Sequence, residues 1–83
     1  MTSVLRVQHV SIPIPAGGIE DGRAFYGDTL GLRQIPTPPA LDGTQILWFA
    51  MGETGDELHL FTEEDDVRST GQHFCMQVDD IAA

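Results

Sequence analysis

The sequence has few basic residues and a single cysteine, and both shortages limit the functions open to it. Four lysine or arginine residues face 13 aspartate or glutamate residues, which leaves a net charge of −9 on 83 residues. Such a charge repels a phosphate backbone, so the composition argues against nucleic acid as a partner. Cys75 has no second cysteine with which to form a disulfide inside the chain, which fits a reducing cytoplasm.

Long hydrophobic runs are also missing. No stretch approaches the roughly 20 apolar residues that span a membrane. The start, MTSVLRVQHV, lacks the charged and apolar regions of a signal peptide. We therefore predict a cytoplasmic protein with no membrane partner. A Gly-rich phosphate loop, a nucleophile elbow and a Cys-x-x-Cys pair are absent as well. The hydrophobic fraction of 41% is ordinary and predicts one small folded domain.

What the sequence does contain is a short pattern that occurs near both ends. Residues 8–14 read QHVSIPI and residues 72–78 read QHFCMQV. In both, Gln-His precedes an apolar residue, a small Ser or Cys, and two further apolar residues two positions apart. Alternation of this kind is typical of a strand.

The pattern between the two copies changes from strand to helix and back. We predict a helix over 19–30, with acidic residues in its first turn and Gly31 as its C-cap. The strands are predicted over residues 4–14, 32–36, 45–51, 57–62 and 72–78. The helix has a predicted apolar stripe, which consists of Ile19, Phe25, Tyr26 and Leu30. A hairpin turn is expected at 52–56 and a new helix start at 79–81. The order β-α-β-β-β, followed by one more strand, predicts an α+β fold.

The three histidines occupy equivalent places in their strands. Side chains alternate between the two faces of a strand, so His9, His59 and His73 each lie opposite their aliphatic neighbours. The helix is expected to cover the aliphatic face, which leaves the histidines on the other. Imidazole suits zinc, iron, nickel, cobalt and manganese. A histidine on a strand more often has a purely structural role, so the residues alone leave both readings open. For Cys75, packing is the simpler role than nucleophilic chemistry.

A resemblance to a known family narrows these readings. FYGDTLGL at 25–32 resembles the FYxxxLGL helix end of the vicinal oxygen chelate superfamily, and ELHLF at 57–61 and GQHFCMQVDDI at 71–81 resemble further landmarks in the expected order. That superfamily includes glyoxalase I, methylmalonyl-CoA epimerase, fosfomycin-resistance enzymes, extradiol dioxygenases and bleomycin-binding proteins. The resemblance implies a β-α-β-β-β module of the glyoxalase/bleomycin-resistance type over residues 1–66. Residues 67–83 would open a second, truncated module with an extra strand.

The resemblance also implies a metal site shared by two modules. His9 matches the first-strand ligand, His73 matches the first-strand ligand of the second module, and His59 stands where the fourth-strand ligand is commonly Glu. Glu57 is the fallback for that position. The fourth ligand, a late Glu in the second module, has no counterpart before Ala83. A homodimer or a missing C-terminal module is therefore the expected partner.

The function implied is that of a metal-dependent, glyoxalase-like lyase or isomerase. A divalent ion (Zn, Ni, Fe or Mn) would chelate vicinal oxygens of a small carbonyl substrate and stabilise an enediolate or enolate. Glu57 is the candidate general base.

One alternative is a metal-free, drug-binding protein of the bleomycin-resistance type, with Trp48, Phe49 or Phe61 against the ligand. A second alternative is an extradiol dioxygenase, in which two His and one carboxylate hold iron. A half-module without function, folding only as a dimer, is the remaining possibility.

Overall fold

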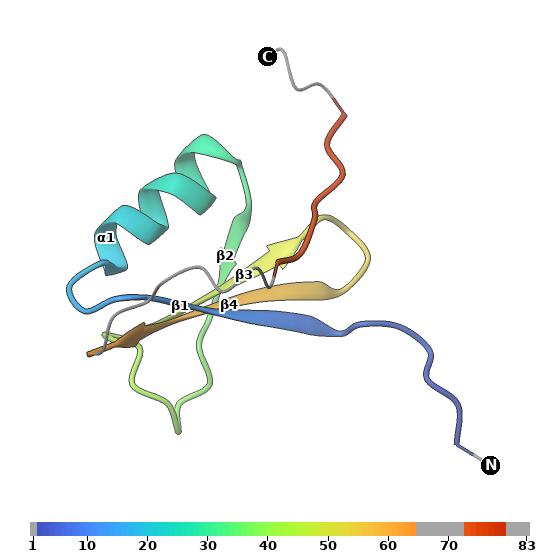
Figure 1. Cartoon of the computed structure of the whole chain (residues 1–83), viewed down its shortest axis with the longest axis horizontal. Coiled ribbons are helices and arrows are strands. Elements are labelled where there is room, and N and C mark those ends of the chain that lie inside the picture. Colours follow the sequence, from blue (N-terminus) through green and yellow to red (C-terminus); the bar gives the residue numbers. More distant parts are fainter. Residues whose placement is uncertain (1, 65–72, 80–83) are drawn as a thin grey trace.

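The computed structural model describes residues 2–64 and 73–79, which form a sheet with a helix against one face (Figure 1). In chain order the elements are β1 (His9–Pro15), α1 (Ile19–Gly22), η1 (Arg23–Thr29), β2 (Arg33–Ile35), β3 (Ile46–Met51) and β4 (Asp56–Glu63). The sheet has the order β1-β4-β3-β2, with β1 parallel to β4 and the other neighbours antiparallel. The predicted α+β fold is confirmed. In the part of the chain that the structure describes, no helix is long and apolar enough to cross a membrane.

The helix begins and ends close to the predicted bounds, but its second part is wider than an α-helix. Over η1 the turns are π-helical, and the N–H of Leu30 donates to the carbonyl of Phe25 at 2.9 Å. Leu30 is the C-cap residue, and Gly31 directly after it has a φ of 75°, the left-handed conformation that favours glycine and was predicted for it. The chain turns there, and Leu32 packs against the core.

The apolar stripe predicted on the helix is only half right. Ile19 and Tyr26 pack against the core, but Phe25 is 50% exposed and Leu30 is 40% exposed. A π-helix has more residues per turn than the 3.6 on which the predicted stripe rests, so positions drawn on one face drift apart.

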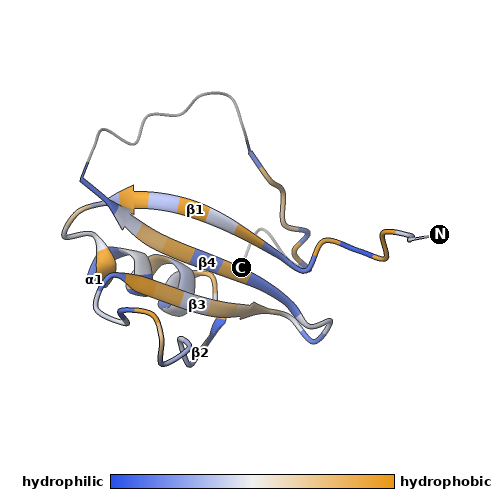
Figure 2. Ribbon diagram, turned by 90° about the horizontal axis from the view of Figure 1, so that it is seen from below, coloured by the Kyte–Doolittle hydropathy of each residue, from blue (hydrophilic) through white to orange (hydrophobic). Residues whose placement is uncertain are grey.

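The core lies between the sheet and the helix. Its fully buried side chains come from the two central strands and are Leu47, Phe49, Leu58 and Leu60. Figure 2 shows the helix lying along the face of the sheet, with β1 at one edge. Gly22 is the buried residue of α1, and a Cβ built on it would lie 3.2 Å from Cδ1 of Leu60. The absence of a side chain at Gly22 therefore sets how closely the helix approaches β4.

β1 is shorter than the predicted strand 4–14. It pairs with β4 from His9 opposite Glu57 onward, and β4 itself begins at Asp56. Residues before Gln8 consequently have no ladder partner, and Val4 and Leu5 are each 93% exposed. Because β1 is an edge strand, it tolerates prolines, which cannot donate to a ladder.

The last predicted strand, 72–78, is not formed in the residues that the structure describes. Residues 73–79 have no regular secondary structure, while residue 72 and most of the predicted helix start at 79–81 lie outside the described residues. A strand exists only with a ladder partner. Phe74 nevertheless packs against the core. The proposed division at residues 66 and 67 stays a prediction.

Candidate functional site

The candidate site lies on the face of the sheet that the helix does not cover. Exposure alternates along β1, with Val10 and Ile12 half-buried toward the core and His9 exposed on the other side. In β4, Leu58 and Leu60 belong to the core. Glu57 and His59 therefore project from the opposite face, as His9 does. The predicted separation of aliphatic and histidine faces is found in β1 and β4.

The strand register brings three rings from three strands into one row. His59 of β4 is the direct partner of Trp48 of β3 and of Ser11 of β1. The His59 and Trp48 rings stack with centroids 3.7 Å apart and planes 8° from parallel, and the His9 ring stacks near His59 at 4.2 Å and 21°. His59 thus lies between the two other rings and is only 8% exposed.

The imidazoles of His9 and His59 each have a side-chain oxygen close to one of their nitrogens. Nε2 of His59 lies 2.8 Å from Oε1 of Glu57, and Nδ1 of His9 lies 2.5 Å from Oε1 of Gln8. An ionised carboxylate and an amide oxygen only accept hydrogen bonds, so the two ring nitrogens donate. In the neutral rings, the lone pairs are then on Nδ1 of His59 and on Nε2 of His9.

This donor chemistry fits a transition metal. Neutral imidazoles are common metal ligands, and a ligating histidine usually donates its other N–H to a carboxylate or carbonyl oxygen, as His59 and His9 do. His9 and His59 would supply two nitrogens, and Oε1 of Glu57 lies beside Nε2 of His59. Within residues 2–64 and 73–79, however, no three His, Cys, Asp or Glu side chains are arranged to hold one ion.

His73 is not gathered into a three-ligand cluster with His9 and His59 in the described residues. It lies in the irregular segment 73–79 and is exposed. The roles predicted for His9, His59, His73 and Glu57 stay predictions.

Three aromatic residues were predicted as possible ligand contacts, and for Phe49 this prediction is wrong. It is 0% exposed and belongs to the core, because its position in β3 faces the helix. Trp48 and Phe61 are half-buried, and Phe61 pairs with Ile46.

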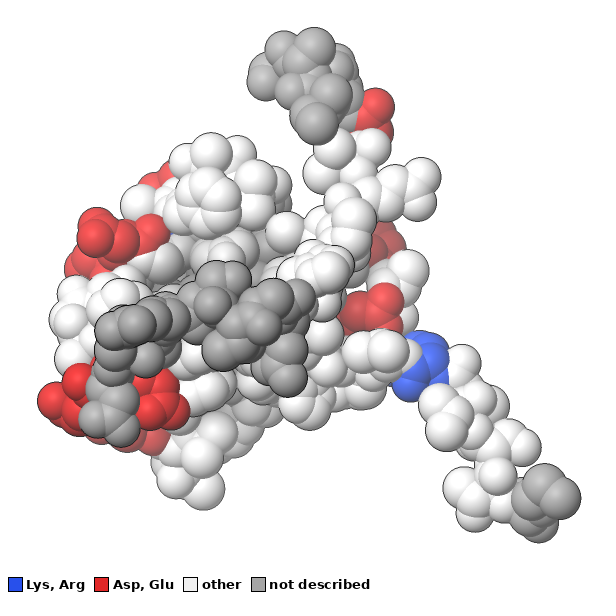
Figure 3. Space-filling view, viewed as in Figure 1, with Lys and Arg blue, Asp and Glu red and all other residues white. Residues whose placement is uncertain are grey.

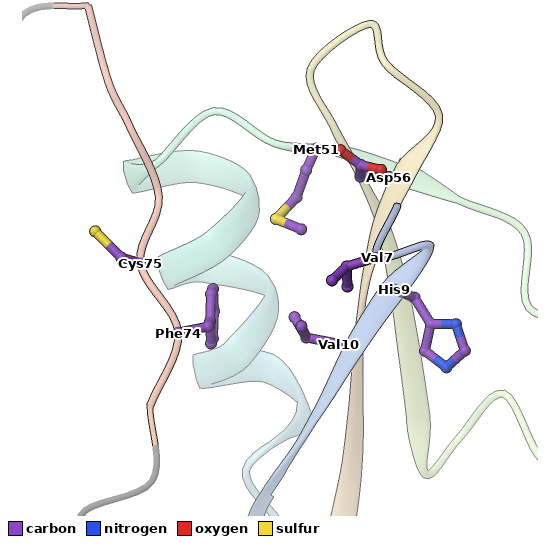
Figure 4. Close-up of a pocket in the computed structure, with 7 residues that line it drawn as sticks. All are labelled: Val7, His9, Val10, Met51, Asp56, Phe74 and Cys75. Carbon is purple, nitrogen blue, oxygen red and sulfur yellow. The ribbon is translucent and has the colours of Figure 1, made fainter. Parts of the chain in front are cut away.

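A cavity of about 230 Å³ lies at the start of β1, and no pattern in the sequence predicted it. It is lined by Val7, His9, Val10, Met51, Asp56, Phe74 and Cys75, and in Figure 4 the His9 ring points away from the side chains of Met51 and Phe74. Most of this lining is apolar, and its carboxylate, Asp56, is paired with Arg6 at 2.5 Å. The hydrogen bond from Thr54 and the nearby Arg6 guanidinium lower the pKa of Asp56.

Acidic side chains are prominent on the surface, as the net charge requires. Figure 3 shows several groups of them on the visible face, with one small basic group at the base of the amino-terminal arm. A surface of this sign raises the local concentration of cations.

No family model matches the chain, and no curated protein does either. A solved structure from Bacillus anthracis, described as "Crystal structure of putative glyoxalase family protein", matches with a TM-score of 0.71 and 33% sequence identity. The match covers 80% of this chain and 52% of that one, so the chain spans about half the length of the protein it resembles.

Proposed function

Because the chain has the glyoxalase-like fold of the vicinal oxygen chelate superfamily, we propose that it contributes to a metal-dependent enzyme of that type. The substrate would be a small carbonyl compound with two adjacent oxygens, and the reaction a lyase or isomerase step that begins with proton transfer next to the carbonyl.

One observation carries this proposal. His9 and His59 stand on neighbouring strands, with ring centroids 4.2 Å apart, and each has one nitrogen hydrogen-bonded to a side-chain oxygen. A neutral imidazole with these hydrogen bonds keeps one lone pair, on Nδ1 of His59 and on Nε2 of His9, and a lone pair is what a metal ligand requires.

The residues on this face have separable roles. His9 and His59 would hold the ion, and the ion, when bound, would act as a Lewis acid toward two neighbouring substrate oxygens. Glu57 would accept the proton, because its carboxylate is on the same face and its side chain is 23% exposed. The half-buried Trp48 would limit water on one side of the site.

The remaining ligands would come from a second module. His73 would contribute from its opening segment, and the second module would belong either to a second copy of this chain or to a C-terminal continuation. An ion held by few protein ligands suits this scheme, since catalytic metal sites keep coordination positions for water or substrate.

The extradiol dioxygenase alternative rests on the same residues. Two imidazoles and one carboxylate are the donor set of non-haem iron oxygenases, and His9, His59 and Glu57 have that composition. Oxygen uptake with a catechol after loading with Fe²⁺, and none with a carbonyl substrate, would favour this alternative.

Metal binding tests the proposal. The purified chain is titrated with Zn²⁺, Ni²⁺, Fe²⁺ and Mn²⁺, and bound metal is measured after dialysis. We expect stoichiometric retention of at least one ion, which His9→Ala and His59→Ala each reduce at least tenfold. Glu20→Ala removes an exposed carboxylate on the helix side of the sheet and is the matched control. If wild type retains none of the four ions, or both histidine variants retain as much as wild type, the proposal is wrong.

A further inference from the structure

The outer edge of β1 has backbone donors only at its start. The N–H of Glu57 donates to the carbonyl of Gln8 at 2.9 Å, and the N–H of Ala16 donates to the carbonyl of Glu63 at 3.1 Å. Successive residues of a strand direct their backbone groups to opposite sides, so the even-numbered residues of β1 face β4. The residues that face outward are His9, Ser11, Pro13 and Pro15. Because proline has no N–H, only the first two can donate to a further strand.

This short donor edge is open in the part of the chain that the structure describes. β1 is the terminal strand of the sheet there, and no backbone bond among residues 2–64 and 73–79 uses the N–H of His9 or of Ser11. A strand edge with unpaired donors is a place where another strand can add. The prolines confine such an addition to the first half of β1.

Residues 73–78 have the pattern of a strand and already lie beside this edge. They read HFCMQV and repeat the alternation of β1. Phe74 packs against the core, as Val10 of β1 does, and Figure 4 shows the two side chains directed toward each other. Cys75 lines the same cavity as His9. The apolar side of the segment is thus anchored next to β1 without a backbone ladder.

The ends of the intervening chain fix the direction. Glu63 is the register partner of Pro15 at the carboxyl end of β1, whereas Phe74 lies at the cavity beside the start of β1. By residue 74 the chain has therefore moved against the direction of β1. A strand formed from residues 73–77 would be antiparallel to it.

We propose that residues 73–77 pair with the start of β1 as a fifth, antiparallel strand, with Phe74 opposite Val10 and Cys75 opposite His9. Directly opposite residues share a face of the sheet, so Phe74 stays on the core with Val10 and Cys75 lies with His9 on the open face. In this register His9 and Cys75 exchange both of their backbone hydrogen bonds. The pairing needs no metal ion, so it stands or falls independently of the proposed function.

Disulfide formation with the native Cys75 tests the register. Cα atoms of a hydrogen-bonded antiparallel pair are about 5.5 Å apart, which is within the roughly 4.4–6.8 Å that a disulfide spans. Diagonal neighbours are about 7–8 Å apart. With oxidised glutathione, we expect His9→Cys to form an intramolecular disulfide at least about tenfold faster than Val7→Cys or Ser11→Cys, which are the matched controls. Free-thiol titration and non-reducing electrophoresis measure the reaction, and circular dichroism shows that each variant is folded.

Three outcomes of this experiment overturn the proposal. Equal rates at the three positions would mean that the segment has no fixed register, and a fastest reaction at position 7 or 11 would mean a different one. Disulfide-linked dimers without a monomeric disulfide would place a second copy on the edge of β1 in place of residues 73–77.

Amide hydrogen exchange tests the pairing without a new cysteine. We expect the N–H groups of His9 and Ser11 to be protected in wild type and to exchange at least about tenfold faster in Phe74→Ser, which removes the anchor. The N–H groups of Val10 and Ile12 face β4 and should stay protected in both proteins, which shows that the sheet remains folded. Phe25→Ser removes an aromatic ring that is 50% exposed on the helix, and this control should leave His9 and Ser11 protected. Exchange at His9 and Ser11 that is as fast in wild type as in Phe74→Ser overturns the proposal.

Discussion

Trp48 and His59 face each other across β3 and β4, and their rings stack with centroids 3.7 Å apart. The pair lies on the sheet face opposite the helix, where the described residues provide no covering layer (Figure 1). His59 is nevertheless almost completely buried, because Trp48 and His9 enclose it from both sides. At this point, the rings of Trp48 and His9 bury His59 in the way that a second layer of structure would.

The single tryptophan makes this relationship measurable. Removing the imidazole in His59→Ala uncovers one face of the Trp48 indole, so we expect its fluorescence emission to shift to longer wavelength and acrylamide quenching to increase. His9→Ala should change both less, because the His9 ring contacts Trp48 only through His59. Identical quenching in His59→Ala and wild type would show that the stack does not persist in solution.

Leu60 is predicted to be a main contributor to stability. It is 0% exposed in the core, and truncation of such a leucine to alanine costs about 2–5 kcal/mol. A chain of this size has a total of about 4–12 kcal/mol, so Leu60→Ala should lose a large part of its folded population. Urea unfolding followed by circular dichroism measures the loss. Leu30→Ala, at a position 40% exposed, is the control and should change the free energy of unfolding by about 0.5 kcal/mol or less.

Gly22 and Gly27 should respond differently to added side chains. A Cβ on Gly27 would meet only Cε1 of Phe49 at 3.5 Å, an ordinary contact, so Gly27→Ala should stabilise the helix by up to about 1 kcal/mol. A Cβ on Gly22 would lie 3.2 Å from buried Leu60, so Gly22→Ala should gain less. Gly22→Val should destabilise the chain by about 1–3 kcal/mol, because it overfills the helix–sheet contact. Urea midpoints ranked in any other order would contradict this account of the contact.

Stability should fall in acid partly because of Asp56. The hydrogen bond from Thr54, together with Arg6, lowers the pKa of Asp56 below its ordinary value of 3.8. A carboxyl group whose pKa is lowered by folding stabilises the fold above its unfolded-state pKa, and this contribution is lost as the pH falls through the folded-state pKa. Thr54→Val should therefore be less stable than wild type at neutral pH, and the difference should shrink below about pH 4. Urea midpoints across this pH range provide the measurement, and a difference that is constant with pH would exclude the Thr54–Asp56 bond as its cause.

Much of the fold followed from local patterns in the sequence. The hairpin between β3 and β4, the approximate helix bounds and the left-handed conformation of Gly31 depend on glycine conformation and on patterns over a few residues, and all three were predicted correctly. The errors arose where the structure of a segment depends on residues far away in the sequence. The start of β1 depends on where β4 begins. Which helix residues face the core depends on π-helical turns, which residue propensities do not predict.

For the candidate site, the sequence by itself determined which residues share a face. Side chains alternate along every strand, so His9, Glu57 and His59 had to lie on the side opposite the core leucines once β1 and β4 were recognised. Only the tertiary structure decided that His59 stacks on Trp48, that Phe49 belongs to the core, and that Nε2 of His59 lies 2.8 Å from Oε1 of Glu57. These features depend on the register between β3 and β4 and on side-chain rotation. Register and rotation follow from the packing of neighbouring strands, which a residue pattern along one strand does not contain.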